Sequence, residues 1–398
     1  MRANGWTGSA PEGFDSATVR GELTIGEIEP AEYQGAADLH GGRSFLQLAS
    51  WAEVKPDWSS DLLAWRDADG RVVGTTLVLF RRLPGLSRWY AYVPEGPDID
   101  WADPWLERWL DPLLDHLERR GAFAVRIGPP AALRRWQATT LKAAAGRRRH
   151  VDHVLADVVE PAGSAASDRL RSLGWQRCGA GRLAIDAQPR YQFQVPIGGR
   201  DHDLLAGFGK EWQRNIRKAM KVGVRTRRGS EHDLATFHEL LRQTELRNGF
   251  RLGRSLAYYQ RQYRALNRDA PDRMRLYLSS WNGEVLAAHT MNVVGRRAWY
   301  QTGGSASHRR EVRPSHILQW TMMRDAQKLG AERYDMRGVS GCLDPEDPAF
   351  GLLRWKLGTG GELVETVGEW ERPLPGPMNL ALHRAMLRYR DRPNSLDG

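Results

Sequence analysis

The chain has 398 residues, 41% of them hydrophobic and 16 of them tryptophan, a composition that excludes an intrinsically disordered protein and a length that suits two domains. Its formal net charge of +10 favours an anionic partner, such as nucleic acid, a phosphorylated substrate or an anionic membrane surface. Cys178 and Cys342 are far apart in the sequence and have no histidine beside them, so we expect neither a disulfide framework nor a metal site.

The N-terminal segment, residues 1–14, is polar and rich in glycine, and it lacks the apolar stretch of a signal peptide. Farther along the chain, no apolar run approaches the length of a membrane span. We therefore expect a cytoplasmic protein, in a compartment where thiols stay reduced.

The first half of the chain has the pattern of a mixed α/β fold. A helix is predicted to begin at Phe45 and to end at Lys55, before a proline. Strands are predicted over residues 61–66 and 72–81, joined by an Asp-Gly hairpin turn, and over residues 88–93. A helix with a stripe of leucines over residues 106–117 and a strand over residues 122–127 follow, and residues 133–145 have a weaker helical pattern.

A helix over residues 208–222 is predicted to have two chemically opposite faces, and Gly223 is expected to end it. One face is apolar and the other is cationic; the apolar residues are Trp212, Ile216, Ala219 and Met220, and the cations are Lys210, Arg214, Arg217, Lys218 and Lys221. No acid compensates the cations on their face, which indicates a surface that binds a polyanion. An ordinary solvated helix face is the alternative.

The second half repeats the plan of the first. Strands are predicted over residues 274–281 and 285–294 around an Asn-Gly turn, then over 298–302, and a helix ending at Gly330 leads to a strand over 332–336. This repetition indicates a structural duplication, and the repeated unit resembles the acetyltransferase-like (GNAT) fold. We therefore predict an α/β (α+β) fold of two tandem GNAT-like domains with mixed sheets, one over residues 1–195 and one over residues 196–375.

The end of the chain carries one more element. A proline-rich segment over residues 373–377 is predicted to be a stiff linker before a last helix, whose basic face holds His383, Arg384, Arg388 and Arg390. We expect residues 376–398 to pack back on the first domain. A peripheral contact with a membrane is the alternative.

A GNAT-like fold raises the alternative of a CoA-dependent acetyltransferase. Such enzymes bind the CoA pyrophosphate on backbone N–H groups of a glycine-rich loop at a helix N-terminus. The corresponding loop of the second copy, residues 307–315, has no glycine and places Pro314, which lacks an N–H, at the helix start. The first copy has acidic residues there, at 98–103. We therefore expect no CoA and no other cofactor.

Several motifs resemble the Fem (FemABX-type) aminoacyltransferases. The basic helix ends in Ile-Arg-Lys-Ala-Met-Lys-Val-Gly-Val, and the next helix ends in Thr-x-x-Arg-x-x-Phe, from Thr244 to Phe250. Further stretches that resemble family motifs, in the family's order, are residues 44–51 with Lys55, the loop 92–97, residues 299–305, residues 334–338 and residues 351–361. The resemblance extends over most of the chain.

This resemblance implies a function. Fem enzymes, including the lipid II:glycine glycyltransferase subgroup that the chain is similar to, move an amino acid from aminoacyl-tRNA to the stem peptide of a peptidoglycan precursor. The implied co-substrate is aminoacyl-tRNA, and the implied acceptor is lipid II or a UDP-MurNAc-pentapeptide-like molecule, with no role for DNA. The implied transferred residue is glycine, alanine or serine.

The resemblance also implies roles for individual residues. Lys356 is expected to bind the aminoacyl end of the tRNA and to stabilise the oxyanion, and Trp355 is expected to stack on the terminal adenosine of the tRNA. The residues expected to contact phosphates, either those of the tRNA or the pyrophosphate of the precursor, are Arg214, Arg217, Lys218 and Lys221. The residues expected to contact the acceptor are Lys55, Thr244, Arg247, Tyr300 and Thr302. Without the resemblance, Trp355 would be interpreted as a core residue and Lys356 as a surface lysine.

Three positions depart from the family pattern. Gly128 stands before a proline where many members have an aspartate, which removes a candidate proton acceptor and leaves the general base open. Thr302 stands where an aromatic residue is common, and Asn248 where an aspartate is common. These changes leave room for two alternatives: an aminoacyl-tRNA-dependent amide ligase acting on a small secondary metabolite, and a tRNA-binding or membrane-surface protein without catalysis.

Overall fold

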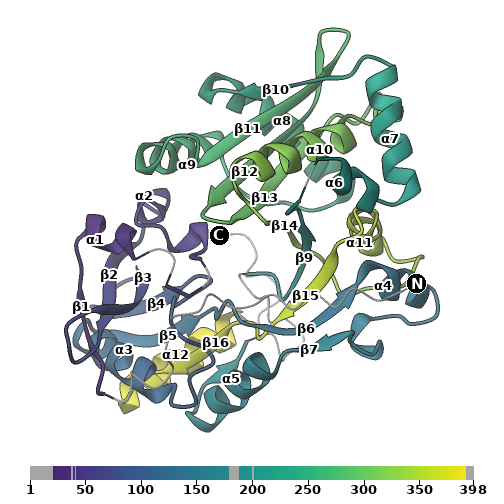
Figure 1. Ribbon diagram of the computed structural model, residues 1–398. Helices are drawn as coiled ribbons and strands as arrows, with labels where there is room; N and C mark the ends of the chain where they lie inside the picture. Colours follow the sequence, from purple (N-terminus) through teal and green to yellow (C-terminus); the bar gives the residue numbers. More distant parts are fainter. Residues whose placement is uncertain (1–20, 37–38, 41, 179–187, 200, 391–398) are drawn as a thin grey trace.

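The computed structural model describes residues 21–36, 39–40, 42–178, 188–199 and 201–390, which form two β-sheets with helices packed on them (Figure 1). The first sheet has seven strands, in the spatial order β1 (Thr24–Glu27), β2 (Ser59–Arg66), β3 (Val72–Arg82), β4 (Trp89–Val93), β5 (Ala122–Ile127), β16 (Trp370–Pro373) and β8 (Gln176–Arg177). The second has nine, in the order β10 (Arg225–Gly229), β11 (Met274–Trp281), β12 (Glu284–Val294), β13 (Arg297–Ser305), β14 (Arg333–Gly338), β9 (Tyr191–Pro196), β15 (Glu362–Thr366), β6 (Ala132–Gln137) and β7 (Val158–Val159).

The helices cover these sheets and fill the connections between strands. Around the first sheet are α1 (Pro30–Gly35), α2 (Trp51–Val54), α3 (Glu107–Arg119) and α12 (Pro377–Arg390). With the second sheet are α4 (Ala138–Ala144), α5 (Pro161–Ser172), α6 (Asp201–Gly207), α7 (Lys210–Lys221), α8 (Leu234–Asn248), α9 (Leu256–Asp269), α10 (Pro314–Lys328) and α11 (Phe350–Leu357). None of the helices in this described part of the chain is long and apolar enough to cross a membrane.

The predicted duplication is present in both sheets. The order β2, β3, β4, α3, β5 in one sheet corresponds to β11, β12, β13, α10, β14 in the other, and in each the helix connects two strands that pair in parallel. Both hairpins turn at a residue with a left-handed backbone, at Gly70 (φ 79°) and at Asn282-Gly283 (φ 50° and 84°). The mixed α/β fold with repeated units is therefore as predicted.

The sheets do not divide at residue 195. Strands β6, β7 and β9 precede residue 196 or include it, yet they pair within the second sheet, and β16 returns from the C-terminal part of the chain to pair with β5 and β8 in the first. Figure 1 shows the yellow β16 among the purple and blue strands of the first sheet. The chain therefore crosses between the sheets several times.

Residues 133–145 are not the single helix that their pattern suggests, because β6 comes first and α4 follows. Arg134 and Arg135 lie on opposite faces of β6, and each forms an ion pair with a glutamate of the neighbouring β15. Pairing between distant parts of the chain therefore overrides the local helical propensity of this segment.

The last helix, α12, lies against β5 and β16 of the first sheet (Figure 1). His383, expected on the basic face of this helix, is buried, and its Nε2 lies 2.6 Å from a carboxylate oxygen of Glu371 on β16. Among the described side chains of α12, the buried ones are Asn379 and His383, so the contact with the sheet includes polar residues.

An apolar cluster joins the two sheets. Phe45 and Trp51 from the first half pack with Ala265 and Leu266 of α9 and with Trp299 of β13. The Phe45 ring centroid lies 5.5 Å from that of Trp51 and 5.5 Å from that of Trp299. Trp299 belongs to this buried cluster, so within the family-like pair Trp299-Tyr300 only the tyrosine reaches the cleft described below.

Candidate functional site

A cleft of about 2410 Å³ lies between the two halves of the molecule. The first half lines it with Lys55, Trp58 and Tyr92, whereas the second half lines it with the start of α7, the end of α8, β13 and α11. Sequence-predicted residues that come together in its wall are Lys55, Thr244, Arg247, Tyr300, Thr302, Trp355 and Lys356. The cleft is therefore the candidate site.

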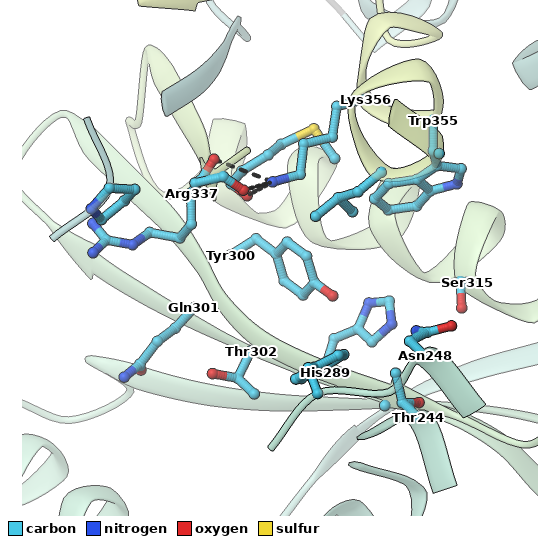
Figure 2. A pocket seen from close by; sticks show the side chains of 18 of the residues that line it. Thr244, Asn248, His289, Tyr300, Gln301, Thr302, Ser315, Arg337, Trp355 and Lys356 are labelled. Carbon is cyan, nitrogen blue, oxygen red and sulfur yellow. Dashed lines mark hydrogen bonds between the residues drawn. The ribbon is translucent and has the colours of Figure 1, made fainter. Parts of the chain in front are cut away.

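Lys356 is buried in the wall of this cleft, near the end of α11. Its ammonium group donates hydrogen bonds to the backbone carbonyls of Met336 at 2.6 Å, Arg337 at 3.1 Å and Gly338 at 2.8 Å (Figure 2). An ammonium has three donors, so these carbonyls occupy all of them. The surface position expected without the family resemblance is wrong. An oxyanion must either replace one of the carbonyls or interact with the charge at longer range.

The three carbonyls are available because β14 is irregular at this point. Its pairing with β9 breaks between Asp335 and Gly338, which leaves the intervening residues outside the ladder. Arg337 has a left-handed backbone with φ of 62°, and its N–H donates to the Asp335 carboxylate at 2.6 Å. This bulge turns consecutive carbonyls toward the Lys356 side chain.

Arg337 in turn links the bulge to the first half of the chain. Its guanidinium donates to Glu95 Oε1 at 2.6 Å and to Gln188 Oε1 at 2.9 Å. Glu95 also accepts a hydrogen bond from the Ser44 hydroxyl. Burial works to raise the pKa of Glu95, but the Arg337 charge and the hydrogen bonds from Ser44 and Arg337 outweigh it and hold this pKa below its usual range.

The environment of Lys356 disfavours its charge. Burial lowers its pKa to about 7, with the Asp335 carboxylate opposing this shift and the Arg337 charge adding to it. Burial also raises the pKa of Asp335, whose Oδ2 has no hydrogen-bond partner among the described residues. A strongly perturbed lysine in a large cleft is typical of a functional site.

Trp355 lies beside Lys356 but is already stacked within the protein. Its ring centroid is 5.1 Å from that of Trp212 and 6.0 Å from that of His316. Its backbone carbonyl also accepts a hydrogen bond from the Trp212 indole at 2.9 Å. Trp355 therefore anchors α11 on the start of α7, and only its cleft-facing part is available for an adenine ring.

Thr244 and Arg247 connect the end of α8 to the end of β13. The Thr244 hydroxyl accepts from the Ser305 N–H at 2.8 Å, and the Arg247 guanidinium donates to the carbonyls of Ser305 at 3.0 Å and Ala306 at 3.3 Å. Burial and the nearby Arg310 charge lower the pKa of Arg247. Arg247 is thus a structural tether as well as a cation in the cleft wall, so its substitution disturbs both roles.

Lys55 is a less constrained cation than Arg247. It has no hydrogen-bond or ion-pair partner among the described residues, and its ammonium lies 5.4 Å from the centroid of the Tyr258 ring. Burial and the Arg254 charge lower its pKa. An anionic group in the cleft would relieve this repulsion.

Tyr300 and Thr302 follow β13 along the floor of the cleft (Figure 2). Burial raises the pKa of Tyr300, so its hydroxyl is neutral, and its ring centroid lies 5.0 Å from that of His289 on the neighbouring β12. A Cβ atom at Gly303 would meet both the Tyr300 hydroxyl and the His289 ring at 2.4 Å. The glycine therefore makes room for this polar pair.

Two histidines in the cleft wall, His289 and His316, are not among the residues predicted from the sequence. Burial lowers the pKa of His289 to about 3 and of His316 to about 4, the latter aided by Arg313, so both imidazoles are neutral near pH 7. His289 Nδ1 lies 3.0 Å from the Gln319 amide nitrogen. No sequence motif surrounds either residue, and only the strand and helix packing brings them to the cleft.

Helix α7 has the two predicted faces, with one exception. Trp212, Ile216 and Ala219 are buried, and the five predicted cations are exposed, but Met220 is also exposed at 50% and does not belong to the apolar face. Gly223 ends the helix with φ of 86°, as expected. Lys210 at the start of α7 lines the cleft, so the basic face continues outward from the cleft mouth.

Comparisons with known proteins now identify the relationship. Residues 28–282 and 279–385 match the model of the FemAB family. The chain belongs to the FemAB family. Lipid II:glycine glycyltransferases of Staphylococcus aureus strains USA300 and RF122 are each 24% identical to it over 420 residues, covering 88% of this chain and 93% of theirs.

Solved structures agree on the fold of this FemAB protein. The crystal structure of FemX superposes with a TM-score of 0.74 at 23% identity, covering 91% of this chain and 99% of FemX. A tandem GNAT protein from the clavulanic acid biosynthesis pathway superposes with a TM-score of 0.50 at 12% identity, covering 89% of this chain and 99% of that one. These structures establish the tandem GNAT-like architecture of the chain. Its transferase activity follows from the FemAB family match and the glycyltransferase relatives.

The position of Gly128 offers no base in this FemAB protein. Its N–H donates to the carbonyls of Val93 and Gly96, and it has no side chain to accept a proton. Carboxylates that do line the cleft are those of Glu211, Glu311 and Asp347.

Among the described residues, one group of potential metal ligands lies outside the cleft lining and consists of Glu27, Asp61 and His116. The Arg120 guanidinium already binds both carboxylate oxygens of Asp61.

Proposed function

We propose that this FemAB protein transfers an amino acid, such as glycine, alanine or serine, from aminoacyl-tRNA to the stem-peptide amine of a lipid II-like peptidoglycan precursor. The observation that carries the proposal is the size and charge of the cleft. At about 2410 Å³ it exceeds by a factor of two or more the roughly 300–1,000 Å³ of pockets for small ligands. Two large anionic substrates that meet at one point need such a space.

The charges are distributed as this reaction requires. The exposed cations of α7 extend from the cleft mouth and suit the phosphates of a tRNA acceptor end. Lys55, which lacks a partner among the described residues, suits an anionic group of the acceptor inside the cleft. The similarity to lipid II:glycine glycyltransferases supports the same class of acceptor.

The chemistry follows from an ester that is already activated. The acceptor amine attacks the ester carbonyl carbon, a C–N bond forms, the C–O bond to the ribose breaks, and the ribose oxygen receives the proton that the amine loses. Lys356 supplies positive charge beside the oxyanion that develops in this step. The main contribution of the remaining cleft residues is to hold the two substrates in register.

A reconstituted transfer assay tests the proposal. The purified protein is incubated with a mixture of charged tRNAs, lipid II and a free amino sugar, and the masses of the products are measured. The expected product is lipid II extended by one or more amino acids. A product formed on a free amine or amino sugar, with lipid II unchanged, would replace the acceptor by a small metabolite, and tRNA binding without any product would support the binding protein instead.

A pair of lysine variants tests the acceptor site separately. Lys55→Ala should raise the apparent KM for the lipid-linked or UDP-linked peptide by about tenfold or more, as expected for a charge-assisted hydrogen bond of about 1.5–3 kcal/mol. Lys328→Ala, which removes an exposed cation from α10 outside the cleft lining, is the matched control. Equal KM values for the two variants would remove Lys55 from acceptor binding.

A further inference from the structure

The backbone carbonyls of residues 336–338, which hold Lys356, depend on an unusual backbone conformation in β14. The bulge in β14 takes residues 336 and 337 out of the ladder with β9, and Arg337 there has φ of 62°. A left-handed conformation costs a residue other than glycine about 1 kcal/mol or more and persists only where the surroundings impose it. Within β14 the Asp335 carboxylate contributes one such contact, and contacts from outside the strand add to it.

The contacts of Arg337 identify what holds it. Its guanidinium lies between Glu95, at 2.6 Å, and Gln188, at 2.9 Å. Both sides of the Glu95–Arg337 ion pair are largely buried, with 11% and 16% of their side chains exposed, so solvent screens it little. Glu95 follows β4 of the first sheet, so this ion pair spans the two sheets.

Glu95 is itself fixed from more than one side. Its backbone is left-handed, with φ of 46°, and its second carboxylate oxygen accepts from Ser44, which also caps the short helix Phe45–Gln47. Gln188, the second partner of Arg337, donates a hydrogen bond to the Tyr92 hydroxyl at 3.2 Å, and the Tyr92 hydroxyl donates one to Glu369 at 2.7 Å. The bulge thus contacts a polar network that reaches Tyr92 in β4 of the first sheet through Gln188, which precedes β9 of the second.

We propose that Glu95 is a positioning residue of this transferase: its ion pair with Arg337 fixes the β14 bulge whose carbonyls hold Lys356 in the cleft. The alignment of Lys356 then depends on the docking of the two sheets, because Glu95 and Lys356 come from opposite sides. This inference rests on the proposed function for its kinetic readout but not for its structural one. The charged or titratable groups around Lys356 and the carbonyls that hold it are Asp335, Arg337, Glu95 and Arg297.

A kinetic cycle tests the proposal. Glu95→Gln keeps the shape of the side chain and removes its charge, and it should lower the single-turnover rate by about 10- to 100-fold, the scale of a misplaced catalytic group, with KM changed less than twofold. In a Lys356→Met background the same substitution should change the rate less than twofold, because there is no lysine left to position. Equal fold-losses in the two backgrounds would overturn the proposal.

A labelling experiment gives a readout that does not need transfer activity. Competitive acetylation with acetic anhydride, followed by peptide mass spectrometry, measures how accessible the Lys356 amine is. In the wild type it should be protected, and in Glu95→Gln its labelling should rise at least fivefold relative to Lys328, an exposed reference. Unchanged protection in Glu95→Gln would overturn the proposal, whereas the absence of transfer by the wild type would overturn only the proposed function.

Two further variants guard against a general loss of folding. Ser44→Ala removes one hydrogen bond to Glu95 and should give the same changes in rate and labelling at a smaller, severalfold level. Asp61→Asn removes a buried carboxylate that binds Arg120 and His116 away from the cleft lining, and it is the matched control. An increase in Lys356 labelling in Asp61→Asn as large as in Glu95→Gln would show a general loosening and overturn the specific role.

Discussion

The charge of Lys356 should control how the transfer rate depends on pH. A lysine pKa of about 7 in place of 10.5 corresponds to roughly 5 kcal/mol of preference for the neutral amine, at about 1.4 kcal/mol for each pH unit. If the ammonium stabilises the oxyanion, the single-turnover rate should fall as the pH rises above about 7. This decrease of the rate above pH 7 should be absent in Lys356→Met, and at pH 6.5 the rate of this variant should be about 100- to 1,000-fold below that of the wild type.

Equilibrium unfolding provides a second measure of the same ionisation. Between pH 7 and 10.5 the unfolded chain binds a proton at this lysine that the folded chain does not bind, so stability should rise with pH across that window. With a folded-state pKa of about 7 and an unfolded-state pKa of 10.5, the full rise in stability across this window corresponds to roughly 5 kcal/mol. In urea titrations, Lys356→Met should lack this part of the rise.

Lys356→Arg separates charge from geometry. Arginine remains charged across the whole pH range, so the decrease of the rate above pH 7 should be absent in this variant. Its planar guanidinium does not match the three backbone carbonyls that hold the lysine, so its rate should stay below that of the wild type. If the rate of Lys356→Met still decreases above pH 7 with the wild-type midpoint, Lys356 is not the group whose ionisation controls the rate. That result would assign the titration to another group, such as the acceptor amine.

Three further predictions concern other parts of the cleft. Burial lowers the pKa of His289 to about 3, so below pH 6.5 the unfolded chain binds a proton that the folded chain does not, and the stability of the fold decreases. In urea titrations, the free energy of unfolding should decrease between pH 7 and pH 5 by about 2 kcal/mol less in His289→Gln than in the wild type. Gly303→Ala should destabilise the fold by about 1–3 kcal/mol in thermal unfolding and raise KM, because its Cβ would press on His289 and Tyr300; unchanged values would show that this pair moves freely. Arg214→Gln with Arg217→Gln should flatten the salt dependence of tRNA binding by about one slope unit for each lost phosphate contact, and a wild-type slope would mark a merely solvated face.

The sequence predicted those parts of the fold that depend on local patterns. The two hairpins and the amphipathic α3 were predictable because turn residues and apolar periodicity specify them within a short window. The segment of β6 was not, because its strand conformation depends on pairing with β15, more than 200 residues away. The same reason explains β16, whose partners β5 and β8 come from the other half of the chain.

The candidate site was predictable to a similar extent. Motif resemblance gave Lys55 and Lys356, and both lie in the cleft wall. It could not show that three carbonyls hold Lys356, because the bulge that presents them depends on Glu95, which is distant in sequence. Nor could it give His289, because a single histidine within a buried strand has no pattern that distinguishes it from a core residue.

The return of β16 to the first sheet has a consequence for how the protein is made. During synthesis, strands β1 to β5 leave the ribosome long before β16. One edge of β5 therefore stays unpaired until nearly the whole second half of the chain has emerged. The first half cannot complete its sheet alone, and a fragment cut near residue 195 would keep that open edge and lose the partner of β5. We therefore expect the two halves to acquire their final structure together, late in translation, and to resist separation into independently folding fragments.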